Sequence, residues 1–168
     1  GNVSVDGGTI KLDGNYPVGT DNVALGNTAL DSNSSGNYST AIGANALTAS
    51  TASSNTGIGF AALEANTSGT QNTAVGMQSL TDNTTANNNT AVGHRSLYVN
   101  TTGANNTAVG SESLDANSTG SNNVAMGAAS LGANTTGTQN VAVGAFALDA
   151  NTTADNNTAV GYDALTAN

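Results

Sequence analysis

Cysteine and tryptophan are missing from this chain of 168 residues, and proline occurs once. Without cysteine, the chain can form neither disulfides nor thiolate metal sites. Aromatic residues make up only 4% and hydrophobic residues 37%, many of them alanine. So little apolar volume excludes the thick core of an ordinary globular domain. The chain must either remain disordered or spread a thin core along a repetitive axis.

Positive charge is also scarce, because Lys11 and Arg95 are the only basic residues in a chain of net charge −9. Nucleic-acid binding requires clustered lysine and arginine to neutralise phosphates, so we expect no nucleic-acid partner. An anionic membrane surface would repel the chain for the same reason. No apolar run approaches the roughly 18 residues of a transmembrane helix, so we expect no membrane insertion of this segment.

An internal repeat dominates what is present. A glycine recurs every 17 residues, except for one step of 16 from Gly43 to Gly59, and a leucine follows each glycine by four residues in all nine copies. The glycines are Gly26, Gly43, Gly59, Gly76, Gly93, Gly110, Gly127, Gly144 and Gly161, and the leucines are Leu30, Leu47, Leu63, Leu80, Leu97, Leu114, Leu131, Leu148 and Leu165. The consensus is N-[T/V]-A-V-G-x-x-[A/S]-L-x-x-N-[T/S]-[T/S]-[G/A]-x-x. The agreement among copies indicates that they occupy equivalent environments.

The repeat predicts an all-β fold, a parallel β-solenoid of nine coils of about 17 residues each. The segment N-T-A-V-G alternates with period two and is rich in residues that favour strands, and glycine ends it. We expect a second short strand around [A/S]-L-x and a turn at N-[T/S]-[T/S]-[G/A]. Glycine, asparagine, threonine and serine are poor helix formers, which excludes a helical repeat. The 16-residue step loses its residue between Ser50 and Asn55, inside the predicted turn.

The leucine column is expected inside the solenoid, stacked about 4.8 Å per coil. The Thr/Val–Val face and the alanine face of the first strand both look buried, and one of them can line the interior. The other requires a cover that a single thin coil lacks. Oligomerisation with closed rotational symmetry would supply that cover. Residues 1–20 lie outside the repeat and are predicted to form an N-terminal joint or cap with a short hairpin, followed by the nine-repeat solenoid over residues 21–168.

Copies such as Asn123-Val124-Ala125-Met126-Gly127 and Asn140-Val141-Ala142-Val143-Gly144 resemble the head repeat of trimeric autotransporter adhesins. The longer copies with Asn-Thr-Thr-Gly in the turn are similar to repeats of phage tail-fibre proteins, including marine ones. The resemblance covers residues 21–168 well and residues 1–20 loosely. It implies a left-handed β-roll that forms a homotrimer about its long axis, in an extracellular location on a virion tail fibre or a bacterial cell surface. The adhesin heads differ in having shorter coils, near 14 residues.

Residues capable of chemistry do not form a repeated motif. His94 and Arg95 occupy positions that vary from coil to coil, and no other candidate catalytic residue clusters with them in the sequence, so we expect no enzyme activity. Asp31, Glu64, Asp115 and Asp149 share the position after the leucine, which is too sparse for a calcium ladder. The glycines match no phosphate-binding loop, so neither a cofactor nor a metal is expected. Dense Asn-x-Ser/Thr sequons, such as Asn83-Thr84-Thr85 and Asn151-Thr152-Thr153, leave glycosylation open in a suitable host.

The leading functional hypothesis is a structural fibre or spacer segment of a surface-exposed trimeric fibre involved in host or surface attachment, with flanking domains contacting a host-cell glycan or protein. The alternative is a ligand-binding solenoid, for carbohydrate or ice, that uses variable outward positions. Its possible ligand contacts are Phe60, Tyr98, Phe146 and Tyr162.

Overall fold

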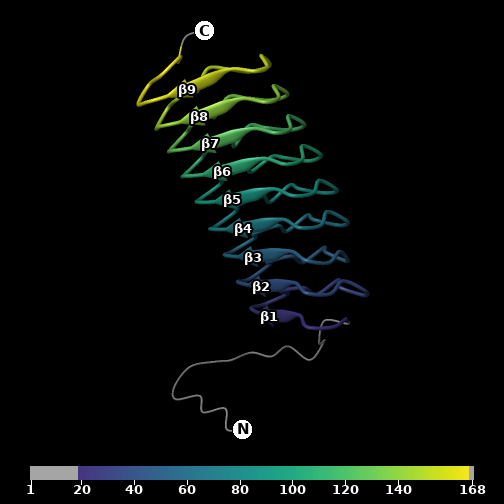
Figure 1. Cartoon of the computed structure of the whole chain (residues 1–168). Helices are drawn as coiled ribbons and strands as arrows, with labels where there is room; N and C mark the ends of the chain where they lie inside the picture. Colours follow the sequence, from purple (N-terminus) through teal and green to yellow (C-terminus); the bar gives the residue numbers. More distant parts are fainter. Residues whose placement is uncertain (1–18, 167–168) are drawn as a thin grey trace, which may run out of the picture.

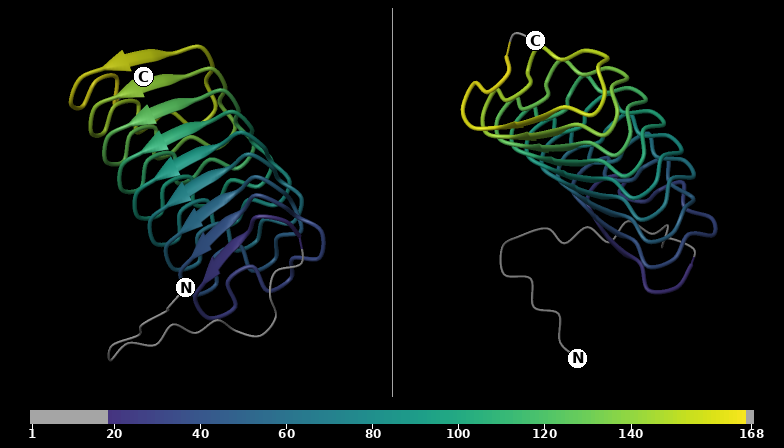
Figure 2. Two further views of the ribbon diagram at one scale, coloured as in Figure 1. Left: turned by 60° about the horizontal axis from the view of Figure 1, so that its bottom comes forward. Right: turned by 45° about the horizontal axis from the view of Figure 1, so that its top comes forward.

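The computed structural model describes residues 19–166, which form a parallel β-solenoid (Figures 1 and 2). Each coil contributes one strand of three residues: β1 Val23–Leu25, β2 Thr40–Ile42, β3 Thr56–Ile58, β4 Thr73–Val75, β5 Thr90–Val92, β6 Thr107–Val109, β7 Val124–Met126, β8 Val141–Val143 and β9 Thr158–Val160. Neighbouring strands pair in parallel, in chain order, in a single nine-stranded sheet. The predicted all-β parallel solenoid is therefore confirmed.

The shorter step between the second and third coils leaves the strands in register. Thr40 pairs with Thr56 and Ile42 with Ile58, as the equivalent residues do in every other step. The missing residue is absorbed in the turn before Asn55, where the backbone forms no strand. The predicted N-terminal joint over residues 1–20 lies almost entirely outside the described residues.

The predicted second strand around the leucine is wrong, because this segment forms consecutive turns in every coil. The leucines have φ angles of 52–56°, and the residues two positions before them have φ angles of 51–60°. These values belong to the left-handed region, which is incompatible with an extended strand. The same backbone shape recurs nine times, because hydrogen bonds between coils hold it. The Leu97 amide, for example, donates to the Ser113 carbonyl at 2.9 Å.

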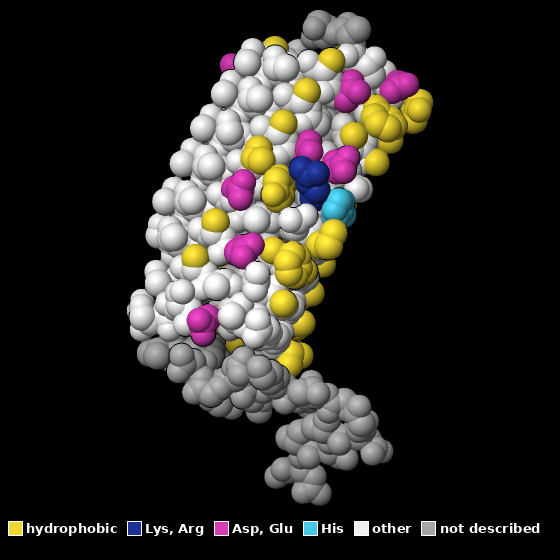
Figure 3. All heavy atoms as spheres, turned by 180° about the vertical axis from the view of Figure 1, so that it is seen from behind, with side chains coloured by type: hydrophobic (Ala, Val, Ile, Leu, Met, Phe, Trp, Pro, Cys, Tyr) yellow, Lys and Arg dark blue, Asp and Glu magenta, His cyan; other side chains and the backbone are white. Residues whose placement is uncertain are grey.

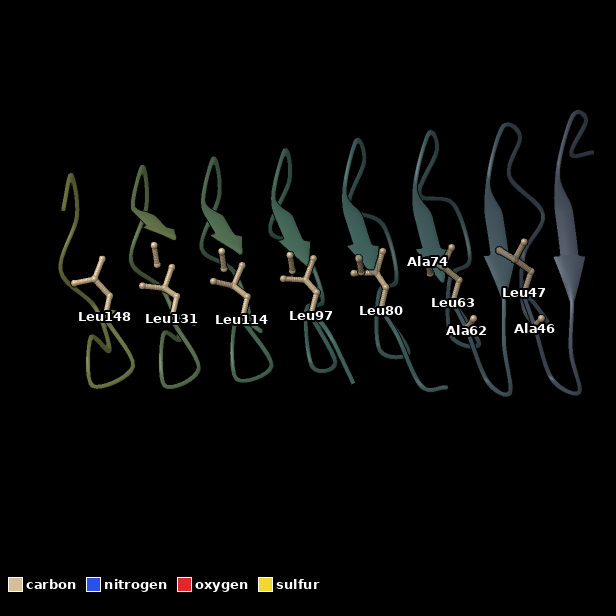
Figure 4. Close-up of a cluster of buried hydrophobic side chains, with 14 of the residues drawn as sticks. Ala46, Leu47, Ala62, Leu63, Ala74, Leu80, Leu97, Leu114, Leu131 and Leu148 are labelled. Carbon is tan, nitrogen blue, oxygen red and sulfur yellow. The ribbon is translucent and has the colours of Figure 1, made fainter. Parts of the chain in front are cut away.

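The apolar part of the interior is dominated by two stacked columns, leucine from the turn and alanine from the strand (Figure 4). Leu47 to Leu148 are completely buried, as are the strand alanines from Ala41 to Ala142. The alanine face of the strand thus lines the interior, which decides between the two faces that the sequence left open. In the third coil, Gly57 replaces the alanine, and a Cβ there would lie 3.2 Å from the Leu47 Cγ.

The repeated glycine forms the corner at the end of each strand. These glycines have φ angles of 131–141°, which L-residues rarely adopt. A Cβ on Gly93 would lie 2.4 Å from the carbonyl oxygen of Gly110 in the next coil. Both the conformation and the close contact between coils therefore require glycine.

Two columns of buried asparagine connect the coils through their side chains. In the first column, the backbone N–H of the asparagine before each strand donates to the side-chain Oδ1 of the preceding asparagine at 2.9–3.0 Å, from Asn72 onward. In the second column, the turn asparagine donates its Nδ2 to the Oδ1 of the preceding one at 2.7–3.2 Å, from Asn83 onward. These bonds satisfy buried amides that would otherwise destabilise the interior.

Candidate functional site

The outward face of the sheet carries an apolar stripe that runs the length of the solenoid. We define the stripe by three columns: the first strand residue, the third strand residue and the residue after the corner glycine. The first column is Val23, Thr40, Thr56, Thr73, Thr90, Thr107, Val124, Val141 and Thr158; the second is Leu25, Ile42, Ile58, Val75, Val92, Val109, Met126, Val143 and Val160; the third is Asn27, Ala44, Phe60, Met77, His94, Ser111, Ala128, Ala145 and Tyr162. Because side chains alternate along a strand, the alanine between the first two columns points inward and these two columns point outward.

Large apolar side chains in the stripe remain accessible to solvent. Leu25 is 41% exposed and Met126 43%, while Phe60 and Met77 beside the strands are 50% and 49% exposed. Figure 3 shows hydrophobic side chains gathered along one edge of the rod through most of its length. Exposed apolar side chains gathered in this way make the stripe a candidate interaction surface.

The stripe contains no acidic residue, and its only titratable side chains are His94 and Tyr162. The acidic residues of the described chain lie on other columns, several of them on the position after the leucine. Copies of a chain with net charge −9 repel one another at long range. An uncharged surface is therefore the place where such copies can approach most closely.

A polar cluster stands beside the stripe on the fifth and sixth coils. The Arg95 guanidinium carbon lies 4.5 Å from the centroid of the Tyr98 ring, a cation–π contact. The Arg95 Nε is buried without a hydrogen-bond partner. One coil further, Glu112 stacks on the Arg95 position, where its amide donates to the His94 carbonyl at 2.9 Å. Figure 3 shows the basic side chain and the histidine side by side, flanked by acidic groups.

Burial raises the pKa of the Asp115 carboxyl in this cluster, Arg95 opposes the rise and Glu112 adds to it. His94 and Arg95, which occupy variable positions of the repeat, are half-buried. The cluster arranges opposite charges around one arginine.

The four candidate ligand contacts do not meet at one place. Phe146 and Tyr162 pack edge to face on the eighth and ninth coils, with ring centroids 6.0 Å apart. Phe60 belongs to the third coil and lies in the stripe. Tyr98 lies beneath Arg95 on the fifth coil. The repeat places Phe60, Met77 and His94 at the same position in three successive copies, and the structure stacks them as a continuous block in one column.

The asparagines of the two turn sequons Asn83-Thr84-Thr85 and Asn151-Thr152-Thr153 are closed to glycosylation in the folded chain. Asn83 is completely buried, its Nδ2 donates to the Asn66 Oδ1 at 2.7 Å and to the Ala86 carbonyl at 3.1 Å, and Asn151 is 8% exposed. An attached glycan would remove these bonds and require space inside the solenoid. The glycosylation that the sequence left open at these asparagines is therefore incompatible with the fold.

Across residues 19–166, no group of three or more His, Asp or Glu side chains is placed to hold a metal ion. The same residues contain no helix that could cross a membrane. Comparisons with protein-family models, curated protein sequences and solved structures find no match to this chain.

Proposed function

We propose that this chain is a structural segment of a surface-exposed fibre, a phage tail fibre or a bacterial adhesin, which associates side by side as a homotrimer. The apolar stripe is the observation that carries the proposal. It runs over nine coils, is free of acidic residues and leaves side chains such as Met126 43% exposed. The function of the segment is to extend and stiffen the fibre, with attachment to the host or surface made by flanking domains.

The period of the stripe supports a second copy of the chain as its partner. Parallel strands lie about 4.8 Å apart, so a partner that covers all nine coils equally must present a matching group every 4.8 Å or so. A parallel copy of the same solenoid has this period along its whole length. Closed rotational symmetry buries the same stripe on every copy, and it produces a discrete assembly rather than an open filament.

The interior supports a mechanical role. Eight steps of about 4.8 Å give a rod of roughly 38 Å, joined along its length by backbone bonds and by the asparagine columns. Each coil contacts only its neighbours, so the rod can lengthen by adding coils without a change of fold. A segment of this design holds distal domains at a set distance from the surface.

Charge introduced into the stripe tests the proposal. In the double variant Val92→Asp/Val109→Asp, two carboxylates replace outward-facing valines of neighbouring strands, and we expect a mass near the 16.3 kDa of one chain. The circular dichroism spectrum should remain that of the parent, because both side chains point away from the interior. The matched control is Thr102→Asp/Thr119→Asp, at exposed turn positions outside the stripe. The proposal is wrong if the parent, the stripe variant and the control all have the same mass.

A further inference from the structure

Side-by-side assembly of a repetitive rod raises the question of register. Nine nearly identical coils allow two copies to slide by one coil, about 4.8 Å, and to meet again through nearly identical layers. Weakly patterned strands are prone to such slips, and coiled coils avoid them with single residues that depart from the repeat. Departures from the consensus within the stripe are therefore the places to seek a register signal.

The two edges of the stripe depart from the repeat in a correlated way. Where the residue after the glycine is large, the strand begins with threonine: Phe60 with Thr56, Met77 with Thr73, His94 with Thr90 and Tyr162 with Thr158. Where that residue is small, the strand begins with valine in three coils: Asn27 with Val23, Ala128 with Val124 and Ala145 with Val141. The second and sixth coils, which combine Ala44 with Thr40 and Ser111 with Thr107, depart from the rule.

Rotational symmetry gives this correlation a meaning. When parallel copies surround a common axis, one edge of each stripe meets the opposite edge of the neighbouring stripe. The residue after the glycine on one copy then meets the first strand residue on the next, at the same coil. A large side chain then faces the more polar threonine, and a small side chain faces the more apolar valine. The total apolar volume of the contact is therefore more similar from one coil to the next.

We propose that the residue after each corner glycine sets the register of association, with the block Phe60, Met77 and His94 as its main determinant; this rests on the self-association proposed above. The block ends abruptly at Ser111, followed by Ala128 and Ala145. A slip of three coils places the large block against Val124 and Val141 and leaves small residues opposite threonine. A slip of two coils places one end of the block against Val23 or Val124. A slip of one coil leaves the block opposite threonines and creates mismatches outside it, such as Tyr162 against Val141. The block therefore discriminates against slips of two coils or more.

Disulfide trapping measures the register directly, because the chain has no cysteine of its own. Chains carrying Ser111→Cys are refolded together with chains carrying Thr107→Cys, the in-register partner, or Thr73→Cys, two coils away. Bridged Cα atoms lie within about 7 Å, whereas two coils correspond to roughly 10 Å, so the two disulfides distinguish registers that differ by two coils. Mass spectrometry of the linked peptides identifies the hetero-disulfides. We expect the 111–107 link to exceed the 111–73 link at least about tenfold.

Removal of the block should allow the copies to associate in other registers as well. In a background of Phe60→Ala, Met77→Ala and His94→Ala, we expect the 111–73 link to rise at least about threefold relative to the 111–107 link. The matched control replaces three exposed turn threonines, Thr85, Thr102 and Thr119, with alanine and should leave the ratio unchanged.

The possible failures are distinguishable. Monomers that form neither link would overturn the self-association and the register proposal together. Multimers whose link ratio is the same with and without the block would overturn the register proposal alone. Multimers that form only 111–111 links would show that like edges meet, which also excludes this register mechanism while leaving the fibre proposal intact.

Discussion

The second coil and the fifth coil share one backbone path but differ in their polar interior. The fifth coil has an asparagine in both asparagine columns, Asn89 and Asn100. The second coil has Ser39 and Ser50 at the equivalent positions and is one residue shorter. Across the second coil, the Asn66 Nδ2 reaches the Ser50 Oγ at 3.4 Å and the Ser39 Oγ reaches the Ala52 carbonyl at 3.5 Å. In the fifth coil, the Asn89 Nδ2 donates to the Gly103 carbonyl at 2.9 Å.

The strand register is nevertheless the same in both coils, and Leu47 and Leu97 are equally buried. The comparison separates two roles. Glycine corners, leucine and the backbone ladder are common to every coil and define its path. The asparagine columns strengthen the connection between coils, and the fold tolerates one interruption of both.

The largest effect is expected at the shared corner. Gly93→Ala places a Cβ 2.4 Å from the Gly110 carbonyl oxygen at a φ of 137°. Gly43→Ala meets the same obstacle in the second coil, at 2.5 Å from the Gly59 carbonyl oxygen. We expect each variant to lose about 4 kcal/mol or more, or to fail to fold, in chemical denaturation. A mild loss at Gly43 with a severe one at Gly93 would show that the second coil has a different path after all.

Truncation of the leucine column should be nearly as severe and equal in the two coils. Leu47→Ala and Leu97→Ala each leave a cavity in a closed interior, and we expect losses of roughly 2–5 kcal/mol. Leu165, 48% exposed on the last strand-bearing coil, provides the control, and its replacement with alanine should have a much smaller effect. Equal melting curves for the three variants would contradict the assignment of the leucine column to the interior.

The asparagine columns should distinguish the two coils. Asn100→Ser removes the acceptor of the 2.8 Å bond from the Asn117 Nδ2 and the donor of the 2.9 Å bond to the Gly103 carbonyl. We expect a loss of roughly 1–3 kcal/mol, because buried amide groups lose their partners. Ser39→Asn, which restores the strand column in the second coil, should gain about 1 kcal/mol. A loss from Ser39→Asn would mean that the shorter turn requires serine, contrary to this account.

The smallest effect on stability is expected at charged residues outside the leucine and asparagine columns. Burial is the main cause of the raised pKa of Asp115. An acid with a raised folded-state pKa binds its proton more readily when folded, so its ionised form lowers stability above that pKa. Asp115→Asn should therefore give a small rise in melting temperature at neutral pH. The difference in melting temperature between variant and parent should disappear as the pH falls through the Asp115 pKa. A melting temperature below that of the parent at neutral pH would indicate that the attraction of Asp115 to Arg95 outweighs the cost of burial.

The repeat alone predicted the nine strands, the buried leucine and the glycine corner, because a residue conserved among internal copies indicates an equivalent environment. It failed at the second strand, since nothing in the sequence [A/S]-L-x shows that Leu97 has a φ of 54°. A left-handed leucine is unfavourable in isolation, and only the bonds between stacked coils hold it. The interior position of Ala91 rather than Val92 was also undecided, because both residues are apolar and alternate along the same strand.

The candidate site was harder to predict than the fold. The repeat already places Phe60, Met77 and His94 at the same position, directly after the glycine, in three successive copies. It does not show that this position lies at the edge of the outward face of the sheet. The contact between Arg95 and Tyr98 likewise depends on a turn that brings residues three positions apart together. Variation among copies indicates a position that the fold does not constrain, but it does not indicate which variable residues become neighbours.

The mass of the unmodified chain in solution tests the central claim that the stripe is covered by further copies. Multi-angle light scattering of the full chain should give three times 16.3 kDa, about 49 kDa, with the elongated hydrodynamic behaviour of a rod. The value should persist on dilution through the micromolar range, because each copy buries a stripe nine coils long. A stable mass of 16.3 kDa at every concentration would contradict the account.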